Sequence, residues 1–310
     1  MTVIVAGATG LAGSAIVKTF ESKGQSVIGI NRSVIDLMDA QATEDFIVKT
    51  RPSLIVDAAA KVGGIGANNS FPVEFLSDNL AIQSNLMNAA HKAGVPNFVF
   101  LGSSCIYPRD CAQPIKEEYL MTGPLEETNS AYAIAKIAGI ELVNSYRKEY
   151  GTKWISLMPT NLYGPRDNFD LTASHVLPAF IRRFVEATES GASTVTLWGS
   201  GSPLREFLHV DDLAQAVLVA SEKYDSSLHL NIGSGEDLSI RELAIKVARA
   251  AGFTGKIEWD SSKPDGTPRK VLDVSRMKAL GWKPTITLDE GIASTIAWYK
   301  EANAQGEVRK

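Results

Sequence analysis

The chain opens on TVIVAGATGLAG, residues 2–13, and this stretch sets the interpretation of the rest. Its first part, residues 2–6, is continuously apolar or β-branched, which predicts a strand buried on both faces. Gly7, Gly10 and Gly13 follow at three-residue spacing, where the strand should turn into a helix. Glycines at such a turn let backbone amides approach a pyrophosphate at the helix N-terminus. The spacing differs from G-x-G-x-x-G, but the position after a first strand predicts a dinucleotide-binding turn.

Strands and helices alternate behind this turn. Apolar runs at 26–30, 54–59 and 97–102 predict strands, and helical patterns cover about 11–22, 40–50 and 73–93. Gly24 and Gly94 stand where two of these helices should end. Continuous apolar strands are typical of a parallel sheet covered on both faces. The sequence therefore predicts the α/β class, with a doubly wound, Rossmann-like and mostly parallel sheet.

The pattern changes after a helix at 131–150 and a strand at 154–158, because residues 159–207 are rich in Pro, Gly, Asn and Ser. Further helices are expected at 175–189, 209–223, 239–251 and 288–300, with a strand at 228–232. We expect a nucleotide-binding Rossmann domain over 1–162 plus about 208–233. A smaller, mixed α/β substrate-binding domain should comprise about 163–207 plus 234–310, with residues 301–310 loosely held.

Composition excludes several classes of function. The chain is 45% hydrophobic and 21% charged with a net charge of -4, so it has no overall attraction for nucleic acid or an anionic membrane. No apolar run approaches the roughly 20 residues needed to span a bilayer, and no signal-peptide pattern is visible. The two cysteines, Cys105 and Cys111, lack metal-ligand spacing. We expect a cytoplasmic protein with no metal site.

The end of the second strand, Gly29-Ile30-Asn31-Arg32, bears on the choice of cofactor. A site that prefers NAD usually carries Asp or Glu there to hold the ribose 2′-hydroxyl, whereas a nearby Arg suits the 2′-phosphate of NADP. No carboxylate precedes Asp36. We therefore expect NADP(H), with Arg32 at the 2′-phosphate; a solvent-exposed arginine without a ligand is the alternative.

The segment YAIAK places Tyr132 and Lys136 on one face of the expected helix 131–150. A nearby ammonium lowers the pKa of a tyrosine, which suits proton exchange with a substrate oxygen. With the glycine turn and Ser103, this pair resembles the extended branch of the short-chain dehydrogenase/reductase superfamily, which acts on nucleotide sugars. The resemblance implies that Ser103 hydrogen-bonds the substrate oxygen, Tyr132 exchanges its proton, and Lys136 also binds the nicotinamide ribose.

Further stretches are similar to the family of that branch that converts GDP-4-keto-6-deoxy-D-mannose to GDP-L-fucose. They are AAKVGGI (59–65), SSCIYP (103–108), MPTNLYGP (158–165), SHVLPAFIRR (174–183), WGSGSPLREFLHVDDLA (198–214) and KPDGTPRK (263–270). The resemblance implies epimerisation at C3 and C5, followed by hydride reduction at C4. It also implies that Cys105 and His175 are the two additional proton-transfer groups, since a thiol and an imidazole can both be tuned towards neutral pH. Which of them acts as base or acid at each carbon stays open.

The same resemblance implies a cofactor site, a substrate site and a homodimer formed through the helices near 75–93 and 131–150. The residues expected at NADP(H) are Gly7, Ala8, Thr9, Gly10, Leu11, Ala12, Gly13, Arg32, Asp36, Leu37, Leu101, Gly102, Ser103, Ser104, Lys136, Pro159, Thr160, Asn161, Leu162 and His175. The residues expected at the GDP-sugar are Arg183, Trp198, Arg205, Asp265, Arg269 and Lys270. Thr9 stands where many bacterial members carry a basic residue, so Arg32 would meet the 2′-phosphate largely alone.

Plainer interpretations remain for single residues. Cys105 could be a small core residue after a buried strand, His175 a half-buried structural histidine, and Trp198 a core aromatic. Asp211 and Asp212 are expected to cap a helix rather than to bind a metal.

Two other classes of function also remain open. A UDP-hexose 4-epimerase or a nucleotide-sugar 4,6-dehydratase would share the fold without needing the pair of Cys105 and His175. A redox-sensing NADP-binding protein would have no use for Ser103, Tyr132 and Lys136 as proton-transfer groups.

Overall fold

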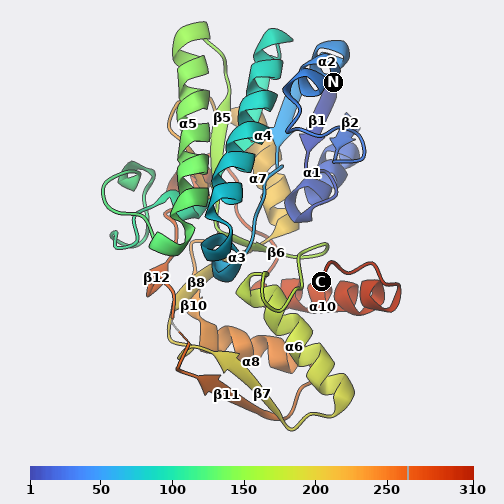
Figure 1. The fold of residues 1–310 in the computed structure, drawn as a ribbon, viewed down its shortest axis with the longest axis vertical. Helices are drawn as coiled ribbons and strands as arrows, with labels where there is room; N and C mark the ends of the chain where they lie inside the picture. The colour runs from blue at the N-terminus through green and yellow to red at the C-terminus, as the bar shows by residue number, and fades with distance from the viewer. Residues whose placement is uncertain (264) are drawn as a thin grey trace.

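Residues 1–263 and 265–310 are described by a computed structural model, shown in Figure 1. Pro264, within the 263–270 stretch, lies outside the described residues. A sheet of six parallel strands forms the centre, in the order β2-β1-β3-β4-β5-β9. These strands are β1 (Thr2–Ala6), β2 (Ser26–Ile30), β3 (Leu54–Asp57), β4 (Asn97–Leu101), β5 (Ile155–Pro159) and β9 (Leu230–Ile232). The predicted doubly wound parallel sheet is therefore confirmed.

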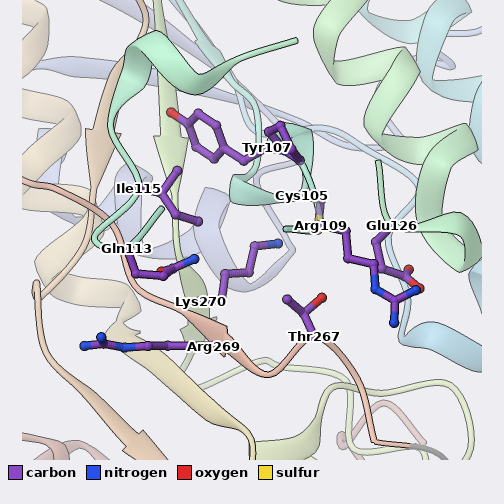
Figure 2. Close-up of a pocket in the computed structure, with 10 residues that line it drawn as sticks. Cys105, Tyr107, Arg109, Gln113, Ile115, Glu126, Thr267, Arg269 and Lys270 are labelled. Carbon is purple, nitrogen blue, oxygen red and sulfur yellow. The ribbon is translucent and has the colours of Figure 1, made fainter. Parts of the chain in front are cut away.

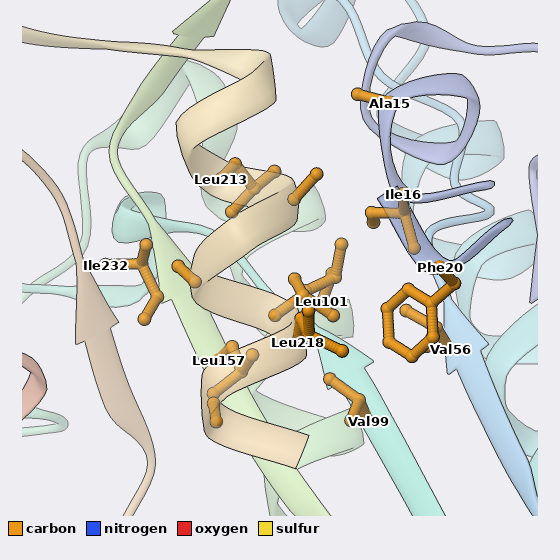
Figure 3. Close-up of a cluster of buried hydrophobic side chains, with 14 of the residues drawn as sticks. Ala15, Ile16, Phe20, Val56, Val99, Leu101, Leu157, Leu213, Leu218 and Ile232 are labelled. Atoms are coloured by element: carbon orange, nitrogen blue, oxygen red, sulfur yellow. The ribbon is translucent and has the colours of Figure 1, made fainter. Parts of the chain in front are cut away.

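Helices cover both faces of this sheet. On one face lie α1 (Leu11–Ser22) and α7 (Val210–Lys223), whose apolar side chains meet those of the strands in Figure 3. On the other face lie α2 (Ala40–Thr50), α4 (Pro72–Lys92) and α5 (Ser130–Tyr150). Gly24 and Gly94 follow α1 and α4 with φ of +72° and +68°, in the left-handed region that favours glycine.

A second group of elements packs around its own core, below the large sheet in Figure 1. Its helices are α6 (Val176–Ser190), α8 (Ile240–Ala251) and α10 (Leu288–Ala304). Its strands are β6 (Asn161–Tyr163), β7 (Thr194–Trp198), β8 (Leu204–His209), β10 (Asp237–Ser239), β11 (Lys256–Asp260) and β12 (Arg269–Lys270). Parallel and antiparallel pairs both occur among them, with β10 antiparallel to β8. The two-domain division stays a prediction, and this group of elements has a hydrophobic core of its own.

Residues 271–282 differ from that division, because they return to the large sheet. Leu272 joins the core beneath α4 and α5, while Met277 of α9 (Ser275–Ala279) and Trp282 join the core beneath α1 and α7. The short helix α3 (Ile65–Ser70), between β3 and α4, was not predicted either.

Two expectations about the C-terminal half were wrong. The last residues are held rather than loose: the Arg309 carbonyl accepts a hydrogen bond from the Phe169 amide at 2.9 Å, and Val308 packs against the second core. Asp212 does not cap a helix, because α7 begins at Val210 and the Asp212 carboxylate instead accepts hydrogen bonds from the amides of Thr285 and Ile286.

Candidate active site

The glycine turn leaves no room for side chains. Gly7 has φ +77°, and its amide donates to the Ile30 carbonyl at 2.9 Å. A Cβ on Gly13 would stand 2.1 Å from the Gly7 carbonyl oxygen. Gly10 is the N-cap of α1 and offers no side-chain cap, so the amides of the first helical turn remain free for an anion. The turn therefore fits the pyrophosphate of a dinucleotide.

The other residues expected at the cofactor divide by their exposure. Arg32 and Asp36 are exposed after β2, and Asp36 accepts a hydrogen bond from the Met38 amide at 3.0 Å. Leu37 is buried in the core and can act only as support. The turn residues Ala8, Leu11 and Ala12 are half-buried and Thr9 is exposed.

The end of β4 carries the first catalytic candidates. Gly102 packs so closely on Met158 that a Cβ would lie 2.4 Å from the methionine Cε. Ser103 then caps a short 3-10 helix, Ser104–Ile106, and its Oγ accepts a hydrogen bond from the Cys105 amide at 3.2 Å. One tight turn thus holds the Ser103 hydroxyl against the backbone of Cys105.

Lys136 and Tyr132 reach this turn from α5. The Lys136 ammonium donates to the Leu101 carbonyl at 2.9 Å and lies 5.9 Å from the centre of the Tyr132 ring. Burial lowers the pKa of Lys136 to about 8, against the opposing effect of Asp57. The Ser103 side chain is close enough to Tyr132 to act on the pKa of its phenol. The structure therefore brings Ser103, Tyr132 and Lys136 together.

The pKa of Tyr132 departs from the sequence-based expectation. Burial raises it above its ordinary range, a charge on Cys105 raises it further, and the nearby Ser103 side chain only partly opposes them. The lowering by Lys136 that the sequence suggested does not occur, and burial is the largest effect because the phenol has lost its water. At neutral pH Tyr132 thus carries its proton, as a proton donor in a reduction must.

Cys105 is partly exposed and lies within electrostatic reach of two groups. A charge on the thiol would act on Tyr132 and would raise the pKa of Arg205, which burial lowers. Cys105 also lines a small pocket with Lys270 and Thr267, and Figure 2 shows the last two directed into the same space. Cys105 is therefore not a buried core residue: its thiol is partly exposed and near enough to Tyr132 and Arg205 to affect their pKa values.

His175 is the N-cap residue of α6, and the turn before it is linked to Tyr132 by a backbone contact and one aromatic ring. The Gly64 amide donates to the Ala173 carbonyl at 2.8 Å, which fixes the turn before His175. Gly63, the residue before Gly64, lies against the ring of Phe75. That ring lies edge-on to Tyr132, with ring centres 6.3 Å apart.

The His175 side chain is exposed, yet the protein around it lowers the pKa of its imidazole by desolvation. Its imidazole is neutral at pH 7 and can accept a proton.

The end of β5 completes the rim of the proposed cofactor site. Pro159 and Thr160 are buried, and the Thr160 amide donates to the Ile232 carbonyl at 2.9 Å. Asn161 and Leu162 are half-buried in β6, where the Asn161 side chain donates to the Glu206 carbonyl at 2.8 Å.

Most residues expected at the substrate surround the Cys105 side of the site. Asp265 accepts hydrogen bonds from the Ser200 amide and hydroxyl and acts on the pKa of Arg205, so these two lie close together. Trp198 is 58% exposed and therefore is not a core aromatic. Arg183 is half-buried on α6.

Arg269 differs from its neighbour Lys270. Its guanidinium forms an ion pair with Asp237 at 2.5 Å, and Figure 2 shows it extending away from Cys105. Lys270 is the cation of the two that is directed into the pocket.

Several residues of this region were not predicted from the sequence. Arg109, Gln113 and Glu126 line the pocket with Cys105 but belong to no motif. Thr267 lies inside the 263–270 stretch, so that motif could have indicated it. Within the described residues, no cluster of three or more His, Cys, Asp or Glu side chains could hold a metal ion.

A nucleotide-binding turn, a Ser–Tyr–Lys cluster and a doubly wound sheet together define a nicotinamide-dependent enzyme of the extended short-chain class. The profile of the NAD dependent epimerase/dehydratase family matches residues 3–233. The chain belongs to this family.

Curated relatives and a solved structure show which members of this family the chain is similar to. The chain is 53% identical over 301 residues to "Probable GDP-L-fucose synthase 1" of Oryza sativa subsp. japonica, with 96% of this chain and 92% of the relative covered. It is 48% identical to "GDP-L-fucose synthase" of Escherichia coli (strain K12), with 96% of each covered. A GDP-L-fucose synthetase from Naegleria fowleri, solved with NADP bound, superposes with a TM-score of 0.91 at 30% identity, covering 100% of this chain and 96% of that one.

Proposed function

We propose that this chain is an NADPH-dependent GDP-L-fucose synthase. It converts GDP-4-keto-6-deoxy-D-mannose to GDP-L-fucose by epimerisation at C3 and C5, followed by reduction at C4. The observation that supports the proposal is the turn after β4, where Cys105 follows Ser103 by two residues near Tyr132 and Lys136. A plain ketoreductase would need the cluster but not the thiol.

Epimerisation uses the acidity that the C4 ketone gives to its neighbouring carbons. A base removes the proton at C3 or C5, and an acid returns one on the opposite face, which inverts the centre. Cys105 and His175 are the proposed groups. The neutral imidazole of His175 suits proton transfer at neutral pH, and Cys105 is a partly exposed thiol two residues from Ser103.

Reduction uses the Ser103–Tyr132–Lys136 cluster. NADPH supplies the hydride that C4 accepts. Ser103 holds the C4 oxygen and Tyr132 donates its proton to it, so that the ketone becomes an alcohol and the tyrosine a phenolate. Lys136 stabilises that phenolate, and solvent then returns the proton to Tyr132.

The diphosphate and guanine of the substrate need cations and flat surfaces. We assign Arg183, Arg205 and Lys270 to the phosphates, since arginine and lysine side chains are common phosphate ligands. Trp198 offers an exposed ring, and Asp265 is held next to Arg205. Arg269 contributes less to the phosphates than its motif suggested, because Asp237 already neutralises it.

A homodimer and a cytoplasmic location are the remaining parts of the proposal. The helices α4 and α5 lie side by side, and each carries an exposed apolar residue, Val73 and Ile134. These would be covered in a dimer built on the two helices, which sedimentation of the purified chain would detect. Within the described residues, no helix is long and apolar enough to cross a membrane.

Incubation with GDP-4-keto-6-deoxymannose and either NADPH or NADH tests the function. We expect GDP-L-fucose to form, with NADPH oxidised in preference to NADH. No turnover with either cofactor would exclude the enzyme, and equal use of the two would exclude the role of Arg32.

A further inference from the structure

Asp57, the last residue of β3, is a buried carboxylate to which the proposed mechanism gives no role. Its exposed fraction is 0%, and its Oδ1 accepts a hydrogen bond from the Ala59 amide at 3.1 Å. Its Oδ2 has no hydrogen-bond partner within the described part of the chain. Because an ionised carboxylate is costly to bury, a nearby positive charge is the expected compensation.

The position of Asp57 in the sheet brings it to Lys136. Side chains alternate along a strand, and Ile55 of β3 faces α4 and α5, so Asp57 faces the same way. In the register of the sheet Asp57 lies opposite Phe100. The Lys136 ammonium stands 4.7 Å from the centre of the Phe100 ring and donates to the carbonyl of Leu101. The carboxylate and the ammonium therefore occupy the same level on one face of the sheet.

Few ionisable groups surround Asp57 in the described part of the chain. From α5, Lys136 and Tyr132 are the ionisable groups that interact with it. The neighbouring strands β1 and β4 present Ala6 and Phe100 at its level, and neither carries a charge.

Asp57 and Lys136 each affect the pKa of the other. Burial raises the pKa of Asp57 to about 6, and Lys136 opposes that rise. Burial lowers the pKa of Lys136 to about 8, and Asp57 opposes that fall. Lys61, the cation nearest to Asp57 in sequence, is instead paired with Glu74 and Asp78.

We propose that Asp57 is a positioning residue for the proton step, whose buried carboxylate keeps the Lys136 ammonium charged beside Tyr132. This inference rests on the function proposed above for Lys136 and Tyr132. When Tyr132 gives its proton to the substrate oxygen, a phenolate forms in a buried place. A charged Lys136 stabilises that phenolate, whereas a neutral amine would not.

Stability measurements test the pair without substrate. The folded pKa of Lys136 lies below the ordinary 10.5, so the free energy of unfolding should rise with pH between about 8 and 10.5. In Asp57→Asn that rise should begin below pH 8, because the amine loses its counter-charge. At pH 7 the effects of Asp57→Asn and Lys136→Met should be non-additive in the double variant. An unchanged pH window together with additive effects would overturn the proposal, whether or not the chain is a fucose synthase.

The pH profile of NADPH oxidation tests the functional part. In Asp57→Asn its alkaline limb should move to lower pH by about one unit or more. Asp167→Asn is the matched control, since Asp167 is also buried with an unpartnered oxygen but does not contribute to the pKa of Lys136. Its limb should stay in place. Lower turnover in Asp57→Asn with an unmoved limb would reduce Asp57 to a structural residue. Absence of turnover in the wild type would instead refute the proposed function. The stability measurements on the single and double variants would then decide whether Asp57 and Lys136 interact.

Discussion

Cys105 lies where it can meet both a proton donor and a cation. It is two residues from Ser103 in one tight turn, and its charge is felt by Tyr132 and Arg205. A thiol in this position could exchange a proton with a neighbouring carbon of the substrate. This setting supports its proposed role at C3 or C5.

Replacing the thiol should separate epimerisation from binding. Cys105→Ser should slow the exchange of the C3 and C5 protons with solvent deuterium by about 10²–10⁴-fold, the range for losing a general acid–base group. Proton NMR of the GDP-sugar in D₂O measures this directly. Cys111→Ser is the matched control and should exchange at the wild-type rate. Normal exchange in Cys105→Ser would make Cys105 a packing residue.

The pH dependence of that exchange should report on His175. Desolvation lowers the pKa of its imidazole below the ordinary 6.5. The neutral, proton-accepting form is therefore still the major one at pH 6.5. We expect the acid limb of the exchange rate to lie below pH 6.5, and His175→Gln to remove it. A limb at or above pH 6.5 that survives the substitution would contradict the role of His175.

The motifs identified the groups that react but not their charge states. Ser103, Tyr132, Lys136 and Cys105 could be named from spacing and resemblance. The raised pKa of Tyr132 could not, because it depends on burial by segments distant in sequence. Asp57 escaped notice for the same reason: in the run LIVDAA it is an ordinary strand residue until the sheet register sets it against Phe100.

At the scale of elements, the loop after β3 determines where His175 stands. The Asn79 side chain of α4 holds the backbone of Lys61, and Asn68 of α3 holds the Gly63 carbonyl at 2.7 Å. The Gly64 amide then holds the Ala173 carbonyl in the turn before α6. The diglycine of AAKVGGI is thus a close backbone contact between two parts of the site.

Adding a methyl group at that contact should displace His175. In Gly64→Ala the new Cβ would stand 2.6 Å from the Ser174 carbonyl oxygen, so the turn must move. We expect C3/C5 exchange to fall by about 10–100-fold, because small misplacements of a catalytic group have effects of that size. In Gly66→Ala the Cβ would be an ordinary 3.5 Å from the nearest carbonyl, and exchange should be unchanged. Equal exchange rates in both variants would refute the positioning role of this loop.

Long elements were predictable and short ones were not. Helices such as α5 and α8 lie within about one residue of their expected bounds, since apolar periodicity over several turns is a strong signal. The strands β10 and β12 contain three and two residues, too few for any period, and exist because β8 offers them a partner. Pairing of this kind is a tertiary effect.

At the scale of the whole molecule, the C-terminal tail packs against the second core. The amide of the fully buried Phe169 donates to the Arg309 carbonyl at 2.9 Å, and Val308 packs nearby. The polar composition of 301–310 hid this, because a single backbone hydrogen bond and one valine leave little trace in a sequence.

Removing the tail should therefore cost stability. A chain ending at Gly306 leaves the Phe169 amide unpaired, which we expect to lower the free energy of unfolding by about 1–3 kcal/mol. Denaturant titration measures this, and a chain that lacks only Lys310 is the control. Equal midpoints for the two would show that the tail contributes nothing.

The two cores also explain which part of the architecture could be anticipated. The parallel sheet follows from the strand–helix alternation of the first half, where successive strands are joined through helices. The return of residues 271–282 to the large sheet could not be foreseen, because Leu272 and Met277 form no recognisable period and their partners lie far back in the chain.

The most direct test of the whole account is one reaction run in D₂O with GDP-4-keto-6-deoxymannose and NADPH, with the product read by NMR. The account predicts GDP-L-fucose that carries deuterium at C3 and C5 from solvent and hydrogen at C4 from the cofactor. A reduced sugar with protium retained at C3 and C5 would contradict it, since the chain would then be a ketoreductase in which Cys105 and His175 move no protons.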